Sequence, residues 1–176
     1  MQDTISRYLT NMPDVRVRRA IQFLMIALAD RYNAQMLSPA AIVITGAASA
    51  NAKTGANAVL ALTNSGNASA LVSVAAATSL VPFVGTTLIN TFNVYVFYVD
   101  TAGTVTAAMG TAATTLAGVV FPQMPQGKAC IGGFTVNPTA GSFIGATTAL
   151  DAVNTNVVFF SPVGPWDPTV LLGATT

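Results

Sequence analysis

The sequence predicts a mainly β protein, an antiparallel β-sandwich or jelly-roll-like barrel, with a long N-terminal α-helix. An apolar repeat of helical spacing lies before residue 38, in the part of the chain that carries all five of its arginines. After residue 40, short β-branched runs alternate with turn residues. Short strands with turns about every ten residues are typical of sandwiches and barrels. We expect residues 1–39 to be an arm and helix for assembly and anchoring, and residues 40–176 to be a β-sandwich domain.

The helix is predicted from Asp14 to Leu37, about 36 Å long at 1.5 Å per residue. Asn11 can cap its start, Pro13 suits the first turn, and Asp14 favours the positive end of the helix dipole. Ser38-Pro39 is expected to end it.

One apolar stripe follows this helix at spacings of four, three and four residues, formed by Val17, Ile21, Leu24 and Leu28. Phe23, Met25 and Ile26 widen the stripe until the middle of the helix is apolar almost all round. A helix of this kind is buried or is packed on several sides by other chains. The sequence therefore predicts an assembly interface made of Arg16, Val17, Arg19, Ile21, Leu24, Met25 and Leu28.

The cluster of Arg16, Arg18 and Arg19 allows two interpretations. It could contact nucleic acid, or it could form solvated helix turns that pair with acids on a neighbouring subunit. Three arginines in a chain of net charge +1 are far from a basic footprint, so we favour the second interpretation and expect no nucleic-acid partner.

The clearest predicted strand is Phe92–Val99, which is apolar on both faces except at Asn93. This pattern indicates a central strand covered on both sides. Asp100–Gly103 should form a tight hairpin turn, since Asp begins such turns well and Gly tolerates the left-handed backbone at their end.

Further strands are predicted around that hairpin, and Gly132-Gly133 suggests a β-bulge in one of them. Asn64–Asn67 is expected to be a turn, and Ala112–Val120 is ambiguous between a short helix and a strand. The remaining predicted strands are Ala41–Thr45, Val59–Thr63, Leu71–Val74, Thr104–Ala108, Ala129–Val136 and Asn156–Phe160.

The composition argues against catalysis, because the chain has neither His nor Glu. A serine or cysteine nucleophile usually needs a nearby imidazole, and zinc sites draw on Cys and His, whereas Cys130 is the single thiol. The acids are scattered singly: Asp3, Asp14, Asp30, Asp100, Asp151 and Asp167. We therefore expect no catalytic, cofactor-binding or metal-binding residues, and no enzyme activity.

Charged residues make up 7% of the chain and hydrophobic residues 52%, against roughly 25% charged residues in ordinary soluble domains. Such a chain is expected to bury surface in a membrane or against other chains. The uncharged stretch Thr54–Val99 contains Gly, Asn and Pro82, so it does not suit a membrane-spanning helix. Asp3 and Arg7 precede no apolar core of a signal peptide. Burial against copies and partners is the remaining expectation.

Four segments, among them Ser79–Phe83 and Gly141–Asn154, taken in order resemble segments of structural proteins of tailed-bacteriophage virions. The segment Gly141–Asn154 is similar to a G-F-x-G-T-T-x-L-D-A segment that closes such chains, although Ala146 stands where that pattern commonly has Thr. The resemblance spans roughly residues 79–160 in order. Its other parts are Ser79–Phe83, Tyr98–Thr106 and Pro122–Ala129, with a less distinctive likeness at Arg7–Asn11.

The resemblance implies a virion protein, found in the host cytoplasm before assembly and in the capsid afterwards. The expected role is a head decoration or cement protein that bridges subunits of the major capsid protein, and a homotrimer is the expected oligomer. The alternative is a tail or fibre component with a receptor-binding role, for which Trp166 could line a sugar site. A non-viral surface-layer or pilus protein is a further alternative, disfavoured by the expected absence of a signal peptide.

Overall fold

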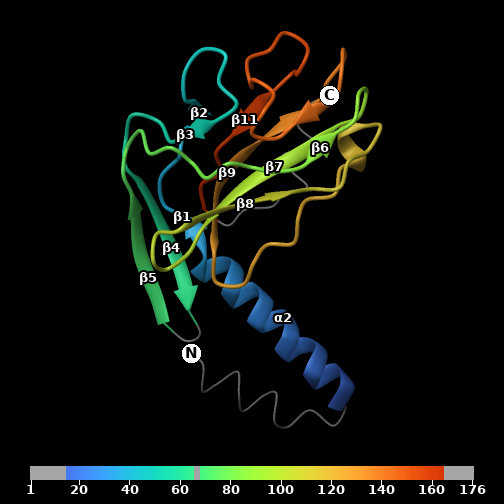
Figure 1. The fold of residues 1–176 in the computed structure, drawn as a ribbon. Helices are drawn as coiled ribbons and strands as arrows, with labels where there is room; N and C mark the ends of the chain where they lie inside the picture. Colours follow the sequence, from blue (N-terminus) through green and yellow to red (C-terminus); the bar gives the residue numbers. More distant parts are fainter. Residues whose placement is uncertain (1–14, 66–67, 165–176) are drawn as a thin grey trace.

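The computed structural model describes residues 15–65 and 68–164, and these residues form a mainly β protein in which every strand pairing is antiparallel, as predicted (Figure 1). One α-helix, α2 (Val15–Asn33), precedes the strands, and a short 3-10 helix, η1 (Leu116–Gly118), follows β8. The strands are β1 (Gln35–Met36), β2 (Val43–Ile44), β3 (Ala52–Lys53), β4 (Val59–Ser65), β5 (Ala68–Val74), β6 (Thr86–Thr87), β7 (Asn93–Val99), β8 (Val105–Met109), β9 (Ala129–Val136), β10 (Phe143–Ile144) and β11 (Val158–Phe160).

Two sheets form most of the body. The larger has the strand order β11-β9-β7-β8, and the smaller has the order β1-β4-β5. Two short pairs, β10-β6 and β2-β3, complete the strand pairing of the described residues. One hydrophobic cluster joins side chains of both larger sheets, including Val59 and Val72 from the smaller sheet and Phe97 and Ile131 from the larger. The two sheets therefore share a single core.

Strand β7 is the centre of this body, since all seven of its residues are buried. Tyr95, Phe97 and Val99 face the cluster shared with β4 and β5. On the opposite face, alternate β7 residues pack in a second cluster beneath Val119 and Phe121 of the segment that follows β8. The prediction of a central strand covered on both faces is confirmed.

The predicted hairpin turn after β7 is confirmed. Asp100 Oδ1 accepts hydrogen bonds from the backbone N–H groups of Ala102 and Thr104, each at 2.9 Å. Gly103 takes the left-handed backbone at φ +80° and donates its N–H to the Asp100 carbonyl at 3.0 Å. The aspartate thus fixes the turn from which β8 returns along β7.

The predicted bulge at the glycine pair is also present. Phe97 lies opposite Gly132, whereas Tyr98 lies opposite Cys130, so Ile131 is the extra residue on β9. Gly132 has a φ of +134°, a region that side chains rarely adopt. A Cβ at Gly133 would lie 2.1 Å from the Tyr95 carbonyl oxygen, so only glycine allows this close approach of the strands.

The long helix expected to reach Leu37 is not seen. Helix α2 ends at Asn33 after 19 described residues, and Gln35–Met36 instead pair with Leu62 and Ala61 of β4. Met36 is buried in the shared core, so burial of this residue in the sheet outweighs a weak helical preference. The cap and first turn predicted at Asn11–Asp14 lie outside the described residues.

Other predicted elements are present but shorter. The Ala41–Thr45 run gives only the two residues of β2, because Ala41 takes a φ of +46° that interrupts an extended strand. Asn156–Phe160 gives the three residues of β11. The ambiguous segment after Gly110 forms η1, and an isolated bridge joins Thr111 to Val120.

Candidate assembly surface

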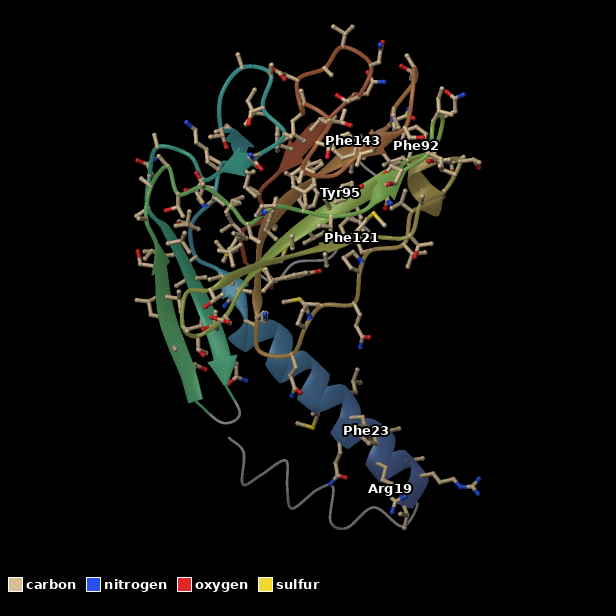
Figure 2. The ribbon with its side chains drawn as sticks, in the orientation of Figure 1. Arg19, Phe23, Phe92, Tyr95, Phe121 and Phe143 are labelled. Carbon is tan, nitrogen blue, oxygen red and sulfur yellow. The ribbon has the colours of Figure 1, made fainter. Side chains whose placement is uncertain are left out.

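Helix α2 runs outward from the sheets, with its C-terminal end next to β1 and its N-terminal half extending away from them (Figure 1). Figure 2 shows Arg19 and Phe23 on the outlying part of the helix, whereas Tyr95 and Phe143 lie among the strands. The helix therefore has sheet neighbours near one end and presents the rest of its length to the surroundings.

Large apolar side chains are exposed on this outlying part. Phe23 is 70% exposed and Leu24 is 59% exposed, and Val15 and Val17 are each about half exposed. Exposed apolar side chains scattered singly over a surface are ordinary, but four on one stretch of helix favour an interaction site. In contrast, the aromatic residues of the body are packed: Phe134 lies within 4.8–6.4 Å, ring centre to ring centre, of five other aromatic rings.

The structure places the residues of the predicted interface on α2, with different exposures. Arg16, Val17, Arg19 and Leu24 are exposed, while Ile21 and Met25 are partly buried. Leu28 belongs to the same helix, but its side chain lies outside the described part of the structure. The set thus shares one helix, and the described members are accessible or partly accessible to a partner.

The exposed apolar residues do not lie on a single line. Successive residues of an α-helix are about 100° apart around its axis, so Phe23 and Leu24 point to different sides. A partner that covers the stripe of Val17 and Leu24 does not automatically cover Phe23. Burying both needs contacts on two sides, as in a bundle of several helices or a socket in another protein.

The arginines near the start of the helix lie off the apolar stripe. Arg19 follows Val17 by two residues, which places it about 200° around the helix, and Arg16 lies about 100° from Val17. Between residues 15 and 33 the helix carries four Arg and one Asp, so its net charge is 4 − 1 = +3. The stripe can therefore pack against an apolar surface while Arg16 and Arg19 face water or an acidic partner.

Two tyrosines and the single cysteine of the β body are buried. Among the described residues, no group of three or more His, Cys, Asp or Glu side chains could hold a metal ion. Burial raises the pKa of the Cys130 thiol from its ordinary 9.0 to about 12, although a backbone hydrogen bond from Gly132 opposes the shift. Burial likewise raises the pKa of Tyr98, with a smaller contribution from Cys130, and it raises the pKa of Tyr95 against a hydrogen bond from Thr87. These groups stay neutral at physiological pH.

No described helix is both long enough and apolar enough to cross a membrane. No family model, no curated protein and no solved structure matches this chain.

The predicted interface omits two surfaces that the structure exposes. The sequence pattern assigns Phe23 only to the widening of the stripe, yet it is the most exposed large apolar residue among the α2 side chains that the structure describes. Leu60 and Leu71 lie on the outer face of β4 and β5, and Leu71 is 65% exposed. The alternation of Ser69, Leu71 and Ser73 with buried Val72 and Val74 is a signal that Leu71 faces away from the core.

Proposed function

We propose that this chain is a non-enzymatic structural protein of a tailed-bacteriophage virion, and specifically a capsid decoration or cement protein. It would stabilise the head by bridging subunits of the major capsid protein. The proposal takes its virion setting from the resemblance over residues 79–160. Its support in the structure is one contrast: the β body has a packed aromatic core, while α2 exposes Phe23 and Leu24.

The apolar helix serves as the anchor in this proposal. Copies of α2 associate along the stripe of Val17, Ile21 and Leu24, and a homotrimer is the proposed oligomer. Phe23 then points outward from the bundle, where it can pack against the major capsid protein. Apolar burial contributes about 25 cal/mol per Å², and a lattice repeats each contact many times, so modest contacts add up against internal genome pressure.

We also infer the finer architecture that suits such a role. The sheets β11-β9-β7-β8 and β1-β4-β5 would form the two layers of an antiparallel sandwich around the shared core. The sandwich would be the body that tiles the outside of the shell, with the helix beneath it.

The proposal is tested by binding to bare phage heads. The purified chain is mixed with heads that lack decoration, bound protein is measured by co-sedimentation, and the rupture temperature of the heads is recorded. Binding with a higher rupture temperature is expected. A truncation lacking residues 1–33, which leaves β1 and the buried Met36 in place, should lose both the helix-mediated oligomer and the binding, and a truncation that keeps both would refute the anchoring role.

Salt provides a second arm of the same experiment. Because α2 would attach through buried apolar side chains, decoration should survive high salt and yield to mild denaturant. Release by salt alone would instead indicate attachment through the arginines. Binding to host cells without binding to heads would favour the alternative of a tail or fibre component. Trp166, the candidate for a sugar site, lies outside the described residues.

A further inference from the structure

Strand β5 forms an open edge of the smaller sheet (Figure 1). It pairs with β4 along its entire length, from Val59 opposite Val74 to Ser65 opposite Ala68. On its other side, β5 has no strand partner among the described residues. The described residues also form backbone hydrogen bonds outside the named strands, and no backbone group of β5 takes part in those. Seven residues of strand are thus open to a further strand.

The pairing of β4 with its other neighbours determines which β5 groups face this edge. Leu60 accepts a hydrogen bond from Leu37 N–H at 2.9 Å, and Asn64 N–H donates to the Gly127 carbonyl at 2.9 Å. The even-numbered residues of β4 therefore bond away from β5, and the odd-numbered residues bond toward it. Because bonding alternates along an antiparallel pair, the edge-facing N–H and C=O groups of β5 belong to Ser69, Leu71 and Ser73.

The sequence of β5 is nearly symmetric about its middle residue. It reads Ala-Ser-Ala-Leu-Val-Ser-Val, with Leu71 at the centre and a serine two residues away on each side. An antiparallel pair of identical strands, related by a two-fold axis at Leu71, would place Leu71 opposite its own copy and each Ser69 opposite Ser73. All the edge-facing groups would then be paired, and no side chain would meet a like charge.

Natural edge strands usually carry devices against such pairing, such as lysines, prolines, bulges or short length. β5 has none of these: it is seven residues long, uncharged, free of proline and in unbroken register with β4. The other outer strands of the two larger sheets are shorter, since β8 has five residues and β11 has three. β1 has two residues, and its Met36 already bridges to Gly164.

We propose that β5 pairs with β5 of a second copy of this chain about a two-fold axis at Leu71, which makes one continuous sheet of six strands. The partner strand is the β5 of a second copy, because an uncharged and nearly symmetric strand is complementary to an antiparallel copy of itself. The outer face of this sheet would align Leu62 and Leu71 of both copies in one row across the strands, which buries part of the exposed Leu71 side chain. This inference does not depend on a role in capsids.

The first test compares two lysine substitutions in the full chain. Leu71→Lys would place two ammonium groups face to face at the two-fold axis, whereas Leu60→Lys adds the same charge one strand away from the edge. The particle mass is measured by light scattering over a wide concentration series. Leu71→Lys should halve the mass when β5 pairing is the contact that joins two copies or two α2 trimers, and Leu60→Lys should leave it unchanged.

The second test uses covalent capture, which does not depend on the helix. In a hydrogen-bonded antiparallel pair the two Cα atoms are about 5.5 Å apart, so a short bismaleimide should link Leu71→Cys chains into dimers on a denaturing gel. Two Leu60→Cys positions would lie three strand spacings apart and four residues out of register, roughly 20 Å in all, and should not link. The buried Cys130 thiol, with a pKa of about 12, should not compete.

The two tests together distinguish edge pairing from other modes of association. Halved mass for Leu71→Lys alone, with bismaleimide dimers specific to Leu71→Cys, supports the edge pairing. A mass unchanged by Leu71→Lys, a chain that is monomeric at every concentration, or equal linking at both cysteine positions overturns it. Capsid binding that fails while these results hold would refute the proposed decoration role and leave the edge pairing intact.

Discussion

Replacing Leu24 with glutamine should weaken self-association through α2 while leaving the fold of each subunit intact. Leucine and glutamine have similar size and similar helix propensity, so the helix itself should persist. Leu24 is 59% exposed in the single chain, and surface substitutions of this kind usually change folding stability by about 0.5 kcal/mol or less. The effect should therefore appear in assembly and not in folding.

The exposed fraction of Leu24 sets the expected size of this effect. Full burial of a leucine side chain contributes about 1.5–3 kcal/mol, so burying the exposed 59% in a bundle contributes about 1–2 kcal/mol per subunit. Summed over a trimer, the loss is about 3–5 kcal/mol. Since each 1.4 kcal/mol is tenfold, the association constant should fall roughly a hundredfold to several thousandfold.

Sedimentation or light scattering over a dilution series measures this constant, and the thermal midpoint reports on the fold. Gln22→Ala is the matched control, because Gln22 is exposed on the same helix about 200° around the axis from Leu24. It should leave the association constant unchanged. A Leu24→Gln chain that assembles as tightly as the parent would refute the conclusion that this stripe is an interface.

Three further predictions concern the body of the protein. Phe134→Ala should lower the free energy of unfolding by about 3–5 kcal/mol in denaturant titrations, because Phe134 is fully buried among aromatic rings; a loss below that of partly exposed Phe159→Ala would contradict this. Asp100→Ala should cost about 1–2 kcal/mol by removing two hydrogen bonds in the β7–β8 turn, whereas the exposed Thr101→Ala should be near neutral. Above pH 9.0 the unfolded chain loses the Cys130 proton and the folded chain keeps it, so stability should fall with rising pH by about 1.4 kcal/mol per unit toward pH 12. Cys130→Val should raise the pH at which stability begins to fall. If that pH is unchanged, the tyrosines cause the fall.

Local patterns in the sequence were enough to predict the centre of the fold. The run Phe92–Val99 has no polar residue except Asn93. Such a strand is stable only when other parts of the protein cover both of its faces. The Asp100–Gly103 turn and the glycine pair on β9 were predictable for the same reason. In each case the chemistry of a few neighbouring residues decides the backbone conformation, whatever lies elsewhere in the chain.

Distant contacts decided where the helix ends. Gln35 and Met36 continue a plausible helix, but their backbone groups pair with β4 and Met36 fills a place in the shared core. Helix propensities differ by less than about 1 kcal/mol per residue, and burial of a methionine exceeds that. No local pattern could predict this outcome, because it depends on residues about 25 positions further along the chain.

The sequence by itself determined the chemistry of the protein: no His, no Glu, few charges, and an apolar helix attached to a β body. The apolar stripe on α2 was predictable from the sequence, because helical spacing is a property of neighbouring residues. Only the tertiary structure decided which apolar residues remain exposed and that β5 lies at an open edge. Strand order arises from pairing between segments far apart in the chain, and the periodicity of a strand is the same at the centre of a sheet as at its edge.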